Sequence, residues 1–81
     1  MRMITRYPNR KFYDARESRY LSVQRIGILV REGEEVVVLE SGTGRDLTSA
    51  TLAQVIYEDE VRQPRLSSRR LAQIIRTGQI P

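Results

Sequence analysis

The sequence predicts an α+β fold built from small hairpin-plus-helix units in the order ββα-ββα, followed by a C-terminal amphipathic helix. Three observations predict this class. Short extended segments separated by turn residues open each half of the chain, apolar residues recur at helical spacing in three later segments, and each of those segments starts at a hydroxyl residue. With 81 residues and 40% hydrophobic content the core is small. We expect one domain over residues 1–60, and a linker with an association helix over residues 61–81.

The first unit is a hairpin followed by a helix. Residues 3–7 alternate well enough for a short strand, Pro8-Asn9-Arg10 has the composition of a turn, and the chain after it is again extended. After a polar loop, residues 19–21 lead into a helix that begins at Ser22 and ends near Gly33. The predicted inner face of this helix consists of Val23, Ile26, Leu29 and Val30.

The second unit repeats that order. Residues 36–39 are β-branched or apolar and favour a buried strand. Gly42-Thr43-Gly44 makes a turn, residues 45–47 return briefly, and Thr48 caps a second helix. The predicted inner face of the second helix consists of Leu52, Val55 and Ile56. Three acids at residues 58–60 oppose the helix dipole, so we expect arginines of the third helix or of a partner chain to hold them.

A third helix follows Pro64, beginning at Ser67 and ending at Gly78. All three helix starts share one pattern, in which a hydroxyl N-cap has an apolar residue before it and another four residues after it; the three are Leu21-Ser22 with Ile26, Leu47-Thr48 with Leu52, and Leu66-Ser67 with Leu71. The apolar face of the third helix is Leu71, Ile74 and Ile75. Three roles are open for this face: packing on its own domain, dimerisation, or binding to another protein or a polymer granule.

Several classes of function are excluded by composition. The chain has no Cys and no His, which removes disulfides, zinc fingers, histidine metal sites and Ser-His-Asp catalysis. Gly42 and Gly44 lack the third glycine of a dinucleotide loop, and the acidic clusters are typical of a solvated face. We therefore expect no enzyme activity, cofactor or metal. No apolar run approaches the length of a membrane span, so we expect a soluble, cytoplasmic protein without membrane contact.

Charge is unevenly distributed along the chain. The net charge is +4, and 13 of the 14 basic residues are Arg. Residues 1–25 carry a net +5, residues 26–60 a net −6, and residues 61–81 a net +5. Two readings stay open: complementarity within a monomer or dimer, and a basic surface for a polyanion.

The densest functional pattern is the basic, aromatic-rich hairpin over residues 6–14, with residues 18–20 close behind. Its guanidinium and amide groups can form hydrogen bonds with phosphates and base edges. The DNA-binding candidates are Arg6, Asn9, Arg10, Lys11, Tyr13 and Arg19. The aromatic residues have two possible roles, which are packing between hairpin and helices or contact with phosphate or a base. Asp14 is expected to organise the loop or to orient Arg16 or Arg19.

Five blocks in this order resemble the N-terminal DNA-binding domain of the polyhydroxyalkanoate (polyhydroxybutyrate, PHB) synthesis repressors, also called PHB accumulation regulators; they span residues 7–14, 18–22, 29–33, 36–38 and 43–48. The first block is the most specific. Residues 61–77 also resemble the stretch that follows in the family.

The resemblance implies a bacterial repressor that binds promoter DNA of carbon-storage genes and is released from it by nascent polyester. It marks as DNA-facing Arg6, Asn9, Arg10, Lys11 and Arg19. The partners it implies are double-stranded DNA, a second copy of the chain or a higher homo-oligomer, and polyhydroxyalkanoate polymer or granule proteins. Because the sequence ends at Pro81, ahead of the family's C-terminal region, we expect DNA binding without polymer sensing. The alternative is a protein–protein or granule interaction module.

Overall fold

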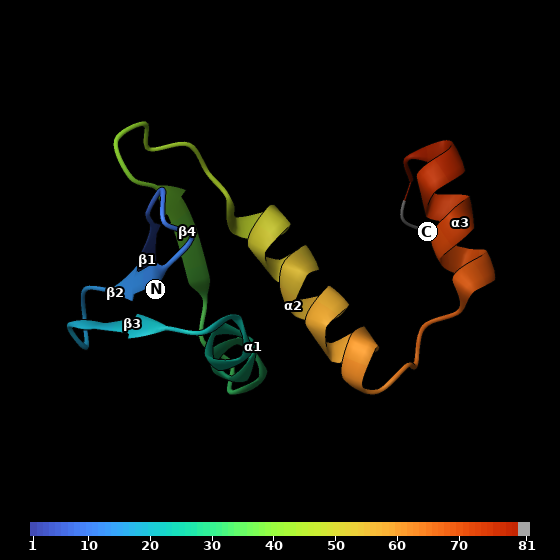
Figure 1. Ribbon diagram of the computed structural model, residues 1–81, viewed down its shortest axis with the longest axis horizontal. Helices are drawn as coiled ribbons and strands as arrows, with labels where there is room; N and C mark the ends of the chain where they lie inside the picture. The colour runs from blue at the N-terminus through green and yellow to red at the C-terminus, as the bar shows by residue number, and fades with distance from the viewer. Residues whose placement is uncertain (80–81) are drawn as a thin grey trace.

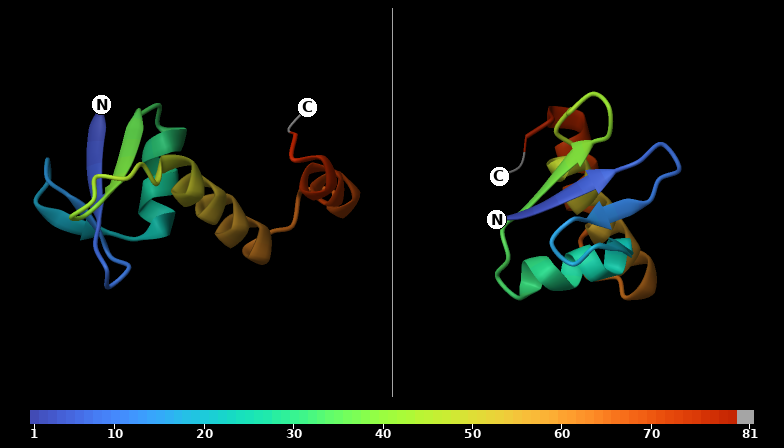
Figure 2. Two further views of the ribbon diagram at one scale, coloured as in Figure 1. Left: turned by 90° about the horizontal axis from the view of Figure 1, so that it is seen from above. Right: turned by 90° about the vertical axis from the view of Figure 1, so that its left-hand side faces the viewer.

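The computed structural model describes residues 1–79 as a four-stranded sheet with two helices against one face and a third helix beyond them (Figures 1 and 2). The elements are β1 (Arg2–Arg6), β2 (Phe12–Asp14), β3 (Arg19–Leu21), α1 (Val23–Arg31), β4 (Val36–Glu40), α2 (Thr48–Arg62) and α3 (Ser68–Thr77). The predicted α+β class is confirmed. The chain end at Ile80 and Pro81 lies outside the described residues, and the expected boundary at residue 60 falls within α2.

The strand order β3-β2-β1-β4 differs from two ββα units. β1–β2 and β2–β3 are antiparallel, whereas β4 lies parallel to β1, with Arg2 opposite Val36 and Arg6 opposite Glu40. The return over residues 45–47 forms only an isolated bridge between Leu39 and Asp46. The ββα-ββα expectation is therefore wrong in detail, because a parallel partner for β1 requires a crossover, which α1 supplies.

The core lies between the sheet and the two helices, and consists of Ile4, Phe12, Leu21, Ile26, Leu29, Val36, Val38 and Val55. Two residues expected on inner faces are exposed instead: Val30 at 39% and Ile56 at 54%. α2 buries only Thr51 and Val55 before it runs past the sheet, so the core does not cover Ile56. The buried face of α1 is centred on Ile26 and Leu29, which leaves Val30 at its margin.

Helix boundaries agree with the sequence in α1 and α3. The hydroxyls of Ser22 and Ser67 accept the backbone N–H of the third residue after each, at 3.0 and 3.2 Å. α1 ends in a Schellman motif with Gly33 at a φ of 94°. There the N–H of Gly33 donates to the carbonyl of Val30, and the N–H of Glu34 to that of Leu29. Gly78, with a φ of 70°, closes α3.

The expected cap of α2 at Thr48 is wrong. The Thr48 hydroxyl accepts the N–H of Val38 at 2.9 Å, so it joins α2 to β4. The carboxylate of Asp46 instead accepts the N–H of Thr48 at 2.8 Å. Tertiary contact outweighs the local cap here, because the buried N–H of an edge strand needs a partner.

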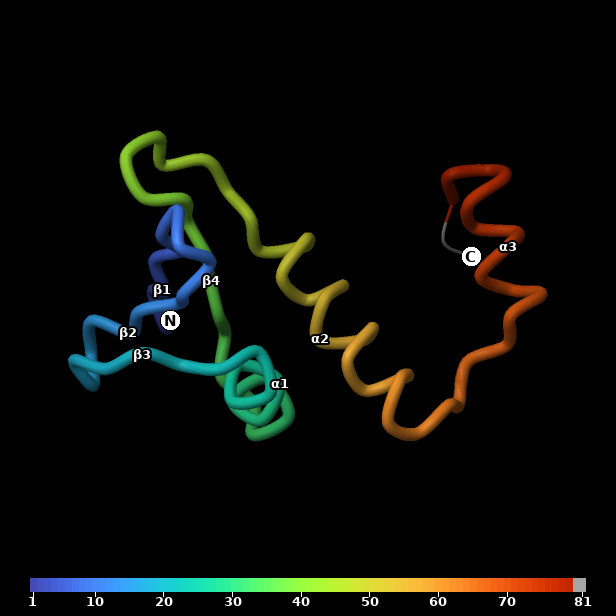
Figure 3. Tube along the Cα trace, in the orientation of Figure 1, coloured from blue at the N-terminus to red at the C-terminus, as the bar shows by residue number. Residues whose placement is uncertain are grey.

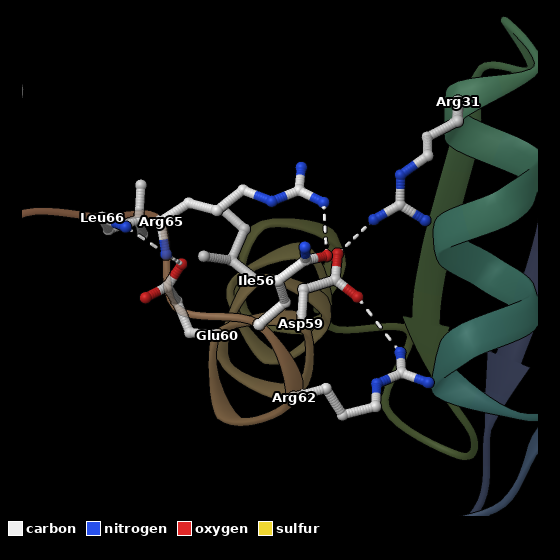
Figure 4. Close-up of a pocket in the computed structure, with 8 residues that line it drawn as sticks. Arg31, Ile56, Asp59, Glu60, Arg62, Arg65 and Leu66 are labelled. Atoms are coloured by element: carbon white, nitrogen blue, oxygen red, sulfur yellow. Dashed lines mark hydrogen bonds and ion pairs between the residues drawn. The ribbon is translucent and has the colours of Figure 1, made fainter.

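α1 and α2 cross closely at Gly27, where an added Cβ would lie 2.8 Å from Val55 Cγ1. Beside this crossing Arg31 donates to Asp59, which also accepts from Arg62 (Figure 4). Gln24 donates to Glu58 at 2.9 Å. The acids of α2 are thus held mainly by α1, and the expectation that arginines of the third helix or a partner hold them is wrong for these two.

Candidate nucleic-acid interface

The turn between β1 and β2 is the best-defined feature among the basic segments. The N–H of Tyr7 donates to the carbonyl of Lys11 at 2.9 Å, and the N–H of Arg10 donates to the carbonyl of Tyr7 at 2.9 Å. This pattern is that of a three-residue hairpin loop whose last residue is left-handed. Pro8 suits the second turn position because its ring presets φ.

Asn9 holds the turn in shape. Its side-chain oxygen accepts the N–H of Lys11 at 3.0 Å, so part of its hydrogen-bonding capacity is committed locally. Asn9 is exposed at the tip of the turn. Of the Asn9 amide that was expected to contact phosphate or a base, only the Nδ2 group is therefore left for that contact.

Arg10 occupies the left-handed position, with a φ of 67°. Glycine is the residue that suits this conformation, and a residue with Cβ pays about 1 kcal/mol to adopt it. Arg10 is exposed, and within residues 1–79 it takes part in no ion pair. A strained turn residue with an uncommitted guanidinium is typical of a contact site.

Three of the four tyrosines, Tyr7, Tyr13 and Tyr20, line the sheet face opposite the helices. Tyr7 and Tyr13 meet edge to face with ring centroids 6.5 Å apart, and Tyr13 and Tyr20 do so at 5.4 Å. The Nζ of Lys11 lies 5.3 Å from the Tyr20 ring. Packing between hairpin and helices, one of the two roles considered for the aromatics, thus applies to Phe12, while Tyr13 and Tyr20 lie on the open face.

Arg6 and Arg19 lie apart from the tip. Arg6 shares a small hollow with Leu47 and Thr51, and its guanidinium lies 5.9 Å from the Phe12 ring centroid. Arg19 pairs with Asp14 in register, which places it at the end of β2 remote from the turn. It forms an ion pair with Glu17 at 3.8 Å. The six candidates therefore do not form one surface.

A second loop lies at the same end of the sheet as the hairpin turn (Figure 3). Because β4 runs parallel to β1, residues 41–46 emerge beside Arg6, whose carbonyl accepts the N–H of Ser41 at 2.9 Å. Arg45 in this loop has a side chain 71% exposed and pairs with Glu40 at 3.7 Å. We call this surface the turn end and define it by Asn9, Arg10, Lys11 and Arg45.

Arg45 was not among the sequence candidates, although residues 43–48 form one of the blocks that resemble the family. The opposite end of the sheet also differs from expectation. Asp14 is fully buried and accepts the N–H of Arg16 at 3.0 Å, so it organises its loop as expected. Its charged partner is Arg2, however, which removes one arginine from the basic surface.

No helix within residues 1–79 has the length and apolar character needed to cross a membrane. Across the same residues, no group of three or more Asp or Glu side chains forms a possible metal site.

Comparisons with known proteins find one family and two relatives. Residues 3–63 match the family model described as the PHB/PHA accumulation regulator DNA-binding domain. A protein of Allochromatium vinosum, named only as uncharacterized, is 42% identical over 76 residues, which are 93% of this chain and 50% of that protein. An "uncharacterized protein in phbA 5'region" of Thiocystis violacea is 37% identical over 76 residues, covering 93% of this chain and 55% of that protein. This chain thus spans about half the length of these relatives. No solved structure matches it.

Proposed function

This chain belongs to the PHB/PHA accumulation regulator DNA-binding domain family, and we propose that it binds duplex DNA through the turn end of its sheet. The observation that carries this proposal is Arg10 at the left-handed position of the hairpin turn, exposed and without an ion-pair partner among the described residues. Lys11 and Arg45 stand beside it to contact phosphates, which position a protein on the duplex without reading its sequence.

Sequence reading falls to Arg10 in this proposal. A guanidinium pairs with the O6 and N7 acceptors of guanine in the major groove, and a two-stranded ribbon is narrow enough to enter that groove. The hydrogen bond from Lys11 N–H to Asn9 preorganises the turn, so little conformational entropy is lost when the complex forms. Tyr13 and Arg19 remain DNA-facing candidates along the open face and at the far end of the sheet.

The regulated genes are proposed from the family and one relative. The family description names PHB/PHA accumulation, and the name of the Thiocystis violacea relative places it beside phbA. We propose that this chain represses genes of polyester storage by occupying their promoters. Promoter occupancy in living cells, measured with and without accumulated polymer, tests this role separately from DNA binding itself.

The experiment for DNA binding starts with selection of a duplex from a random library by the purified chain. Affinity for the selected duplex is then measured by fluorescence anisotropy over a salt series, and should fall steeply because phosphate contacts release counterions. Arg10→Ala should weaken binding by about 1–3 kcal/mol. Replacing the contacted guanine by 7-deazaguanine should weaken binding of the duplex by the parent and leave its binding by Arg10→Ala unchanged.

Arg16→Ala is the matched control, because Arg16 is an exposed arginine at the opposite end of the sheet. Equal losses of affinity for Arg10→Ala and Arg16→Ala would reject the turn end as the surface that recognises the base sequence. A flat salt response with no selected sequence would reject DNA binding. Arg19→Ala in the same series decides whether contact extends along the sheet.

A further inference from the structure

An uncovered apolar surface lies on the part of the chain that follows the core. Val55 is the last core residue, and α2 continues beyond it, away from the sheet (Figure 1). Large apolar side chains exposed after this point are Ile56, Tyr57, Val61, Leu66, Leu71 and Ile75. Four of them line one hollow, and apolar surface gathered in this way marks an interaction site in soluble proteins.

The surface is hollowed into a groove between α2 and α3 of about 560 Å³. Ile56 and Tyr57 of α2 form one wall, and Leu71 and Ile74 of α3 form the other. Leu66, in the connection between the helices, also lines the groove. Two of the three residues predicted to serve dimerisation thus face α2, while Ile75, 82% exposed, does not line the groove.

The bend that creates the groove is specified by hydrogen bonds. The Oε1 atom of Glu60 accepts the backbone N–H of Arg65 at 2.7 Å and that of Leu66 at 3.1 Å (Figure 4). Ser67 then caps α3. Since these bonds satisfy the N–H groups at the bend, α3 leaves α2 in a defined direction.

α3 is poorly covered by the rest of its own chain. It has ten residues, none of them buried. A helix of this length is marginal in water, and helices in proteins derive most of their stability from a packed apolar face. The helix therefore needs a surface that covers Ile75 as well as the groove wall.

We infer that the groove receives α3 of a second copy of this chain, and that the exchange is reciprocal. The groove is concave, which fits a helix and not a flat polymer surface, and its apolar lining does not suit phosphate. Charge favours the same occupant, because α3 carries three arginines and no acid, whereas Glu60 lines the groove and forms no ion pair among residues 1–79. Each chain offers both groove and helix, so a two-fold arrangement closes. The inference does not rest on DNA binding.

The test is the mass of the full chain in solution by analytical ultracentrifugation from low to high micromolar concentration, without DNA. The parent should sediment as a concentration-dependent dimer. Ile75→Glu, on the inserting helix, and Tyr57→Glu, on the groove wall, should each raise the dimer dissociation constant at least about 30-fold, the effect of losing a central anchor. Both side chains are exposed in the single chain, so circular dichroism of the core should be unchanged.

Ile28→Glu is the matched control, since Ile28 is an exposed apolar residue of α1 outside the groove. It should leave the dimer intact. A parent that stays monomeric at high concentration overturns the inference, including the case in which the monomer binds polyester particles through Ile75. A dimer that resists Ile75→Glu and Tyr57→Glu but is broken by Met3→Glu, on the open sheet face, overturns it as well.

Discussion

Arg2 and Asp14 form a buried ion pair, with Nη1 of Arg2 2.6 Å from Oδ2 of Asp14. Asp14 is fully buried and Arg2 nearly so. The same guanidinium also donates to Glu17 at 3.2 Å and to Glu34 at 3.1 Å. One arginine at the start of β1 thereby ties the β2–β3 loop to the connection between α1 and β4, at the end of the sheet opposite the turn end.

The first prediction concerns the stability that this pair provides. Asp14→Asn leaves the buried Arg2 without its nearest counter-charge, and removing one member of a buried pair typically costs about 3–5 kcal/mol. The free energy of unfolding, measured by urea titration at pH 7, should fall by that order. Glu32→Gln, a change at an exposed carboxylate, should stay within about 0.5 kcal/mol of the parent. Equal stability of the two variants would contradict a structural role for the pair.

The second prediction is a pH dependence that comes from Glu34. The hydrogen bond from Arg2 lowers the pKa of Glu34 below its ordinary value. A carboxyl whose pKa is lower in the folded state stabilises the fold above the unfolded pKa, about 4.3 for Glu, and loses that contribution as pH falls through the folded pKa. The difference in unfolding free energy between the parent and Glu34→Gln should therefore be largest near neutral pH and shrink toward about pH 3. A difference that grows on acidification would contradict this sign.

The third prediction tests the close crossing of α1 and α2. In Gly27→Ala the new methyl group meets Val55 Cγ1 at 2.8 Å. Crowding of this kind costs about 1–3 kcal/mol, which exceeds the gain of about 1 kcal/mol in helix propensity. Thermal unfolding should show a less stable protein. Adding Val55→Ala to Gly27→Ala makes room for the methyl group, so the double variant should lose less than the sum of the single losses.

The fourth prediction separates the strain at Arg10 from its binding role. Arg10→Gly relieves the left-handed backbone, so the free energy of unfolding should stay constant or rise by up to about 1 kcal/mol. Affinity for the selected duplex should nevertheless fall, because the guanidinium is gone. Lys11→Gly, at a neighbouring position without positive φ, should lower stability instead. A variant Arg10→Gly that both unfolds more easily and binds DNA normally would contradict the assignment.

The sequence by itself determined the local structure of this chain. The α+β class, the first hairpin turn, the caps at Ser22 and Ser67 and the glycine ends at Gly33 and Gly78 were all predictable. Each depends on residues that are neighbours along the chain, where backbone preference and side-chain capping act directly. The block over residues 7–14 likewise indicated the family that the comparison finds.

Only the tertiary structure decided which distant residues meet. Parallel pairing of β4 with β1 brings Arg45 beside the hairpin turn and leaves Arg19 at the other end. Burial of Arg2 against Asp14 removes a basic residue that composition alone counts as surface. Thr48 has the chemistry of a cap, but its hydroxyl bonds to β4 instead. These outcomes depend on strand order and on the satisfaction of buried polar groups, which are set by long-range packing and leave no periodic trace in the sequence.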